Sequence, residues 1–208
     1  SRRTQNRRKP LGDEPAGPFG TTADFVNEPD TDFSLLENIA WAEALIAAHK
    51  PRHGAQAVDV SLVIGGEEIR QGRQLKDCLD PSRPGTVVGR YRQASAEDID
   101  RALQCASEDP SGWRELTEEE RGTILARVAH ELRKGRGELM GAAMANGGKL
   151  LTESDPEVSE AIDFVEYYAA SAREFRALAT VEVAPLGGGV VVPPWNFPIA
   201  IPCGGIAA

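Results

Sequence analysis

The residues best suited to chemistry stand together near the end of the chain, in the run Val192-Pro193-Pro194-Trp195-Asn196-Phe197-Pro198. An asparagine side-chain amide can donate two hydrogen bonds without carrying a charge. Because prolines on both sides stiffen the backbone, the amide of Asn196 is suited to stabilise an oxyanion that develops only in a transition state. Trp195 and Phe197 offer flat apolar walls for a ring or an alkyl chain. The alternative interpretation is an asparagine that only caps a following helix.

The cysteines and histidines do not form a second centre. The three cysteines are widely spaced and include no CxxC pair (Cys78, Cys105 and Cys203), so neither a disulfide framework nor a zinc site is expected. The three histidines do not stand at ligand spacing from them. Cys203 follows in an apolar IPCGG context, which favours a packed core thiol. This cysteine usage fits a reducing cytoplasm best.

The segments around Asn196 predict how it is positioned. Val190–Val192 is a continuous apolar run, typical of a strand buried on both faces of a parallel sheet. Pro193 and Pro194 end this strand, and an apolar helix is expected to begin near Pro198. A buried strand followed at once by a helix opens a βα unit, and ligands of open α/β sheets sit at the carboxyl ends of the strands.

The rest of the chain alternates strands and helices. A helix is expected from Leu35 to His49, and a strand over 57–64 turns at Gly65-Gly66 into a second, polar strand over 67–76. A short strand follows over 86–92. Further helices are predicted from three start signals, namely the capping boxes at Ser95 and Thr117, and Asp155-Pro156 as a cap followed by proline at the first helical position. Another helix is expected over 139–145.

Charge and composition narrow the function classes. The formal net charge is −9, yet the first ten residues carry five positive charges, so the other 198 carry −14. An acidic body does not favour nucleic acid as a partner, and the basic start, within a Pro- and Gly-rich linker over 1–24, is interpreted as solvated. No apolar run is long enough for a membrane span, and no signal peptide is visible. The chain starts at Ser1 and stops inside the apolar run IPCGGIAA, which suggests a fragment.

The PPWNFPIAIPCG segment closely resembles the PWNFP segment of NAD(P)-dependent aldehyde dehydrogenases. The resemblance extends back through PSRPGTVVGRYRQASAEDIDRAL, through Trp113 to Arg121, and through GKLLTESDPEVSEAIDFVEYYA. FVNEPDTDFS and AIDFVEYYA are similar to one branch, the L-glutamate γ-semialdehyde (1-pyrroline-5-carboxylate) dehydrogenases, and in particular to the C-terminal module of bifunctional proline utilization A. The resemblance covers about residues 25–208.

The resemblance implies an α/β fold. Residues 25–208 would form the N-terminal part of an aldehyde dehydrogenase domain, a Rossmann-like NAD-binding portion with preceding helices and a β-hairpin. Residues 1–24 would link it to a proline dehydrogenase domain that carries FAD. The whole protein is expected to be a cytoplasmic homo-oligomer. It would oxidise the semialdehyde to L-glutamate with NAD, through a thiohemiacetal on a cysteine.

The resemblance also implies roles for individual residues. Asn196 would be the oxyanion-hole donor, and Val192, Pro193, Pro194 and Trp195 would border the nicotinamide ribose. Two residues, Phe197 and Glu160, would line the substrate site. Glu160 shares a helix face with Phe164 and Tyr167, which favours partial burial; the alternative is a solvated helix face.

Two expected motifs do not occur in the sequence. The family's cysteine stands in a Gly-Gln-x-Cys setting and its base in a Glu-x-Gly-Gly setting, both well after the asparagine. The chain alone is therefore expected to be inactive. Two alternatives stay open: a dehydrogenase for another aldehyde, and a non-catalytic aldehyde-dehydrogenase-like module that serves a structural role.

Overall fold

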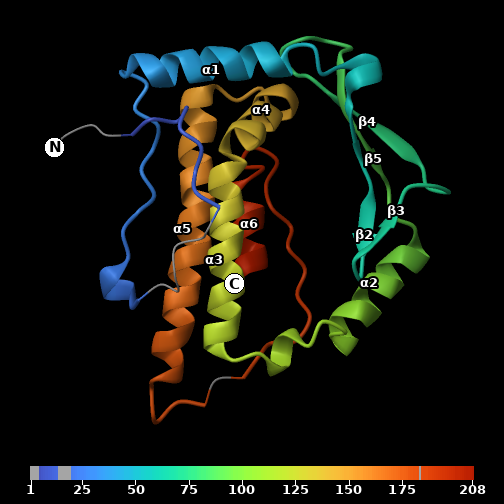
Figure 1. Cartoon of the computed structure of the whole chain (residues 1–208). Helices are drawn as coiled ribbons and strands as arrows, with labels where there is room; N and C mark the ends of the chain where they lie inside the picture. The colour runs from blue at the N-terminus through green and yellow to red at the C-terminus, as the bar shows by residue number, and fades with distance from the viewer. Residues whose placement is uncertain (1–4, 14–19, 183) are drawn as a thin grey trace.

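The computed structural model describes residues 5–13, 20–182 and 184–208. A group of long helices stands beside a smaller layer of strands, and the chain crosses between the two parts by α2 and a short helical turn (Figure 1). The helices are α1 (Leu36–His49), α2 (Ala96–Glu108), α3 (Glu118–Lys134), α4 (Arg136–Gly147), α5 (Leu151–Arg176) and α6 (Ala200–Ala207), with single 3-10 turns at Thr22–Asp24, Gly54–Gln56 and Trp113–Glu115. The strands are β1 (Val58–Val60), β2 (Leu62–Ile64), β3 (Glu67–Ile69), β4 (Leu75–Leu79) and β5 (Val87–Arg92).

The hydrophobic core lies among the helices. Helix α5 packs against α3, α4 and α6, and it supplies most of the fully buried side chains. The central cluster, in which every side chain is inaccessible to solvent, comprises Ala129, Met140, Val158, Ile162 and Val165. This core gives α6, and the loop that leads into it, a rigid surface to lie on.

The strands form two small sheets. In the first, β5 pairs in parallel with β1 and antiparallel with β4. In the second, β2 and β3 form the predicted hairpin across Gly65-Gly66, whose φ angles of 58° and 82° suit the tight turn of a two-residue hairpin. The predicted strand over 57–64 is interrupted at Ser61, because its two halves pair in different sheets. The returning strand ends at Ile69, short of the predicted residue 76.

The predicted helix starts at Ser95 and Thr117 are confirmed, with the side chain of each cap accepting the amide three residues later. The predicted start at Asp155-Pro156 is wrong. Helix α5 begins at Leu151, because the Glu153 carboxylate accepts the Leu150 amide at 2.8 Å. Pro156 lies inside the helix, where it removes one backbone hydrogen bond. Asp155 is buried and its carboxylate accepts the amide and hydroxyl of Thr31 instead of capping the helix.

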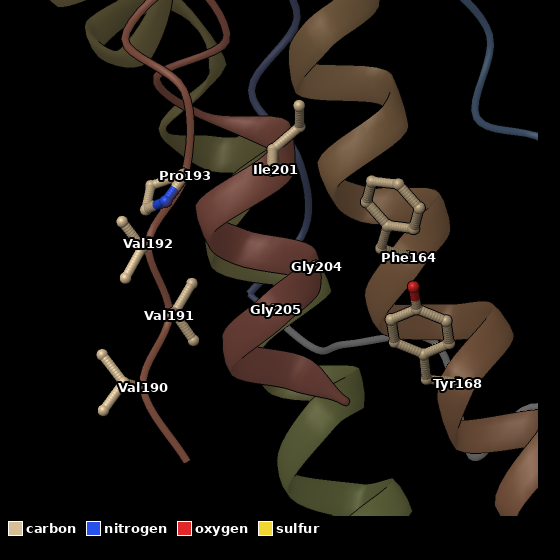
Figure 2. Close-up of a pocket in the computed structure, with 9 residues that line it drawn as sticks. All are labelled: Phe164, Tyr168, Val190, Val191, Val192, Pro193, Ile201, Gly204 and Gly205. Atoms are coloured by element: carbon tan, nitrogen blue, oxygen red, sulfur yellow. The ribbon is translucent and has the colours of Figure 1, made fainter.

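The predicted buried strand at Val190–Val192 is also not observed. The segment is extended beside α6 but pairs with no strand among the described residues (Figure 2). Its side chains are exposed, by 79% at Val190 and 84% at Val192. The reason is physical: a strand becomes buried on two faces only when strands pair with both its edges and helices cover both faces. The helix predicted after it is confirmed as α6.

The described part of the expected linker contacts the helices. The Arg7 amide donates to the Asn38 side chain, and its guanidinium donates to Thr31 Oγ1. Thr22 donates through both its amide and its hydroxyl to Glu174. Residues 1–4 and 14–19 of that segment, including two of its basic residues, lie outside the described part, so a boundary at residue 24 remains a prediction. Within the described ranges, no helix is long and apolar enough to cross a membrane.

Candidate functional site

Asn196 lies in a turn at Trp195-Asn196, four residues before α6 begins at Ala200. Its side chain is exposed, and no hydrogen bond joins its amide to any residue that the structure describes. The capping alternative is therefore not observed, since the residue preceding α6 is Ile199 and the first α6 amide, that of Ala200, donates to Glu157 of α5. Within residues 5–13, 20–182 and 184–208, nothing engages the Asn196 amide, which can therefore donate to a ligand.

The four residues predicted to border a nicotinamide ribose run as one extended, exposed stretch into this turn. Trp195 is 84% exposed, and Val192 has the same exposure. Beside them lies a groove of about 410 Å³ between the 190–193 segment and the helices α5 and α6 (Figure 2). Phe164 and Tyr168 form its far wall on α5, and Val191 faces α6, where its methyl group lies 2.8 Å from where a Cβ of Gly205 would stand. The groove is mostly apolar, as a site for flat rings requires.

The two residues predicted to line a substrate site have different surroundings. Phe197 is 40% exposed, and the ammonium group of Lys149 lies 4.4 Å from its ring centroid. Glu160 lies on α5 and is exposed, so the expected partial burial is not observed. Phe197 directly follows Asn196 in the chain, so the two share the loop. Glu160 makes no hydrogen bond or ion pair with a described residue of that loop.

Two charged residues that the sequence reasoning missed hold the loop. Glu157 is 2% exposed, and one of its carboxylate oxygens accepts the amides of Ile199 (2.6 Å) and Ala200 (3.2 Å). Its other oxygen accepts Lys149 Nζ at 2.6 Å, and Lys149 also donates to the Asn196 carbonyl at 3.0 Å. A signal was present in the sequence: a glutamate stands at helical spacing from Ala161 and Val165 on an apolar face, which indicates a buried and paired charge.

Cys203 fits the predicted packed thiol. It lies on α6, and its Sγ faces the Ala161 carbonyl at 3.7 Å. Burial raises the pKa of the Cys203 thiol, which disfavours the thiolate that a nucleophile needs. Burial also raises the pKa of Cys78. Across the described residues, no cluster of histidine, cysteine and carboxylate side chains could hold a metal ion.

Comparison with known proteins adds the following similarities. The profile of the aldehyde dehydrogenase family matches residues 69–208. A 1-pyrroline-5-carboxylate dehydrogenase of Bacillus thuringiensis (strain Al Hakam) is 35% identical over 191 residues, which are 86% of this chain and 36% of the relative. The corresponding protein of Staphylococcus haemolyticus (strain JCSC1435) is 30% identical over 190 residues, again 86% of this chain and 36% of the relative.

Solved structures show the same likeness. The Thermus 1-pyrroline-5-carboxylate dehydrogenase, crystallised with bound NAD, superposes with a TM-score of 0.78 at 32% identity, over 88% of this chain and 37% of that one. Proline utilization A from Bdellovibrio bacteriovorus, inactivated by N-propargylglycine, has a TM-score of 0.74 at 27% identity, over 88% of this chain and 20% of that one. The chain thus spans little more than a third of the length of the curated relatives it matches.

Proposed function

Because this chain belongs to the aldehyde dehydrogenase family, we propose that it contributes the oxyanion donor and part of the NAD site to an NAD-dependent dehydrogenase. The substrate would be L-glutamate γ-semialdehyde, which arises from 1-pyrroline-5-carboxylate, and the product L-glutamate. The observation that carries the proposal is the exposed Asn196 amide, held on a fixed loop and unused by the described part of the chain. The names of the relatives and of the Thermus structure support the choice of substrate.

The chemistry assigned to Asn196 follows from its charge and position. When a thiolate attacks an aldehyde carbon, the carbonyl oxygen gains a full negative charge. A neutral amide donates more strongly to that oxyanion than to the ground-state carbonyl, so Asn196 stabilises the transition state selectively. Phe197 offers an apolar wall for the alkyl stem of the substrate, and Glu160 is assigned to the substrate site on the family resemblance alone.

The residues near the groove fit a dinucleotide. The exposed 192–195 segment leaves main-chain groups and the flat Trp195 ring available beside the apolar groove. We assign Val192, Pro193, Pro194 and Trp195 to the border of the nicotinamide ribose. The chemistry that NAD supplies when bound is acceptance of a hydride. The residues of this chain bind and orient the cofactor.

The other parts of the proposal concern the whole protein. None of the three cysteines is assigned as nucleophile, so we look for the nucleophile and the glutamate base in sequence outside these 208 residues. We propose residues 1–24 as a linker, residues 25–208 as the N-terminal portion of the dehydrogenase domain, and the cytoplasm as location. A linked proline dehydrogenase domain is supported by the likeness to proline utilization A. We propose an oligomeric enzyme on the family resemblance alone.

The test is an assay of the protein that carries this chain, produced from its whole reading frame. With glutamate semialdehyde and NAD, we expect NADH formation at a higher kcat/KM than with acetaldehyde, benzaldehyde or succinate semialdehyde. Asn196→Ala should lower kcat by about 10²–10³. Asn196→Ala with unchanged kcat would remove the oxyanion role. A higher kcat/KM with another aldehyde would show that the proposed substrate is wrong. No turnover with any aldehyde would favour a non-catalytic structural module.

A further inference from the structure

The loop that carries Asn196 is held at both of its ends by one ion pair, formed by Lys149 just before α5 and Glu157 on α5. Glu157 accepts the amides of Ile199 and Ala200 with one oxygen and Lys149 Nζ with the other. Lys149 Nζ also donates to the Asn196 carbonyl. The two side chains therefore bridge the main chain on either side of the Phe197-Pro198 step.

Both charges are largely removed from solvent. The Glu157 side chain is 1% exposed and that of Lys149 is 13% exposed. A buried charge whose partner is removed is strongly unfavourable, so each member of the pair keeps the other in place. The Phe197 ring lies against the ammonium group and adds a third contact to the same cation.

The turn that carries the Asn196 side chain is exposed to solvent. Trp195 and Asn196 are exposed, and within the described residues the Asn196 amide makes no hydrogen bond of its own. The direction of that amide therefore depends on the loop backbone, and the side chains of Lys149 and Glu157 hold this backbone in place. We propose that the Lys149–Glu157 pair is the positioning element that presents the Asn196 amide to the developing oxyanion. This inference rests on the proposed function of Asn196.

The first test measures the loop in the chain itself, without catalysis. Backbone amide exchange at Ile199 and Ala200, followed by NMR, should quicken at least tenfold in Glu157→Gln and in Lys149→Met. Lys149→Arg, which keeps the charge, should restore slow exchange. Exchange at Ala129, in the buried core, should stay within twofold in every variant and so report an intact fold.

The matched control is a Glu–Lys pair on the surface. Glu131 lies 3.3 Å from Lys134 on α3, and its side chain is 69% exposed. Glu131→Gln should leave exchange at Ile199 and Ala200 unchanged. If Lys149→Met leaves them equally unchanged while Ala129 stays protected, the pair does not hold the loop and the inference is overturned.

The second test measures catalysis in the protein produced from its whole reading frame. Lys149→Met should lower kcat by about 10–100-fold with the KM for NAD within twofold, and Lys149→Arg should recover most of kcat. An unchanged kcat in Lys149→Met, beside an impaired Asn196→Ala, would overturn the inference and leave the proposed function standing. An unchanged kcat in Asn196→Ala would overturn the function, and with it the catalytic half of this inference, while amide exchange still decides whether the pair orders the loop.

Discussion

Replacement of Arg136 should show how strongly the buried network between α4 and α5 holds the helices together. Arg136 is 2% exposed and donates to the carboxylate and carbonyl of Asp155, to Ser159 Oγ and to Glu28. Asp155 is fully buried, and Arg136 forms a salt bridge with its carboxylate at 2.9 Å. Methionine fills a similar volume without a charge, so in Arg136→Met the Asp155 carboxylate keeps, among the described residues, only the Thr31 amide and hydroxyl as hydrogen-bond donors.

The size of the expected loss in unfolding free energy follows from the burial of the ion pair. Breaking a buried ion pair by removing one partner costs about 3–5 kcal/mol, because the remaining charge is uncompensated. For a chain of this size, the urea dependence of the unfolding free energy is about 2–3 kcal/mol per M. The urea midpoint should therefore fall by about 1–2.5 M in Arg136→Met.

Urea unfolding followed by far-UV circular dichroism measures this shift. Arg101→Met is the control, because Arg101 pairs with Glu67 at 2.9 Å on the surface, where such pairs contribute about 0–1 kcal/mol. Adding Asp155→Asn to Arg136→Met should restore part of the unfolding free energy, because it removes the unpaired Asp155 charge. If Arg136→Met lowers the urea midpoint no more than Arg101→Met does, the buried network does not stabilise the fold by the expected amount of about 3–5 kcal/mol.

Three further outcomes are expected. Gly141→Ala should lower the unfolding free energy by about 1–3 kcal/mol in urea titrations, because its Cβ would lie 2.2 Å from His49 Nε2 in a buried contact. The Arg73 side chain, with the Ser95 cap, holds the pKa of Asp98 well below its usual range, so its ionised form stabilises the fold above about pH 4 and that stability is lost as the pH falls. Asp98→Asn should therefore lower the melting temperature at pH 7, and the difference from the parent should shrink at pH 3. Burial raises the pKa of Cys203, so iodoacetamide should alkylate it more slowly than free glutathione at pH 7.5, as peptide mass spectrometry would show.

Local signals in the sequence predicted the local structure well. The capping boxes at Ser95 and Thr117 need only a hydroxyl and a carboxylate three residues apart, and both form as expected. The Gly65-Gly66 hairpin likewise depends on backbone freedom at two adjacent positions. The turn at Asn196 before α6 follows from the flanking prolines.

Features that depend on distant partners were not predicted. A run such as Val190–Val192 reads as buried, but burial requires neighbouring strands that the described residues do not supply. Asp155-Pro156 carries a start signal, yet Asp155 is engaged by Thr31, which lies 124 residues earlier. The apolar face that Glu157 shares with Ala161 and Val165 indicates burial, but no local pattern identifies its partners, which are amides 42 and 43 residues later.

The way in which the loop is fastened also imposes an order of assembly. Helices α3, α4 and α5 are consecutive in the chain and pack on one another, so they can form as soon as residues 118–176 have left the ribosome. At that moment Lys149 and Glu157 are still hydrated, because Ile199 is synthesised 42 residues after Glu157. We therefore expect the Asn196 loop to fold late, when the loop and α6 pack onto helices already in place and exclude water from the ion pair.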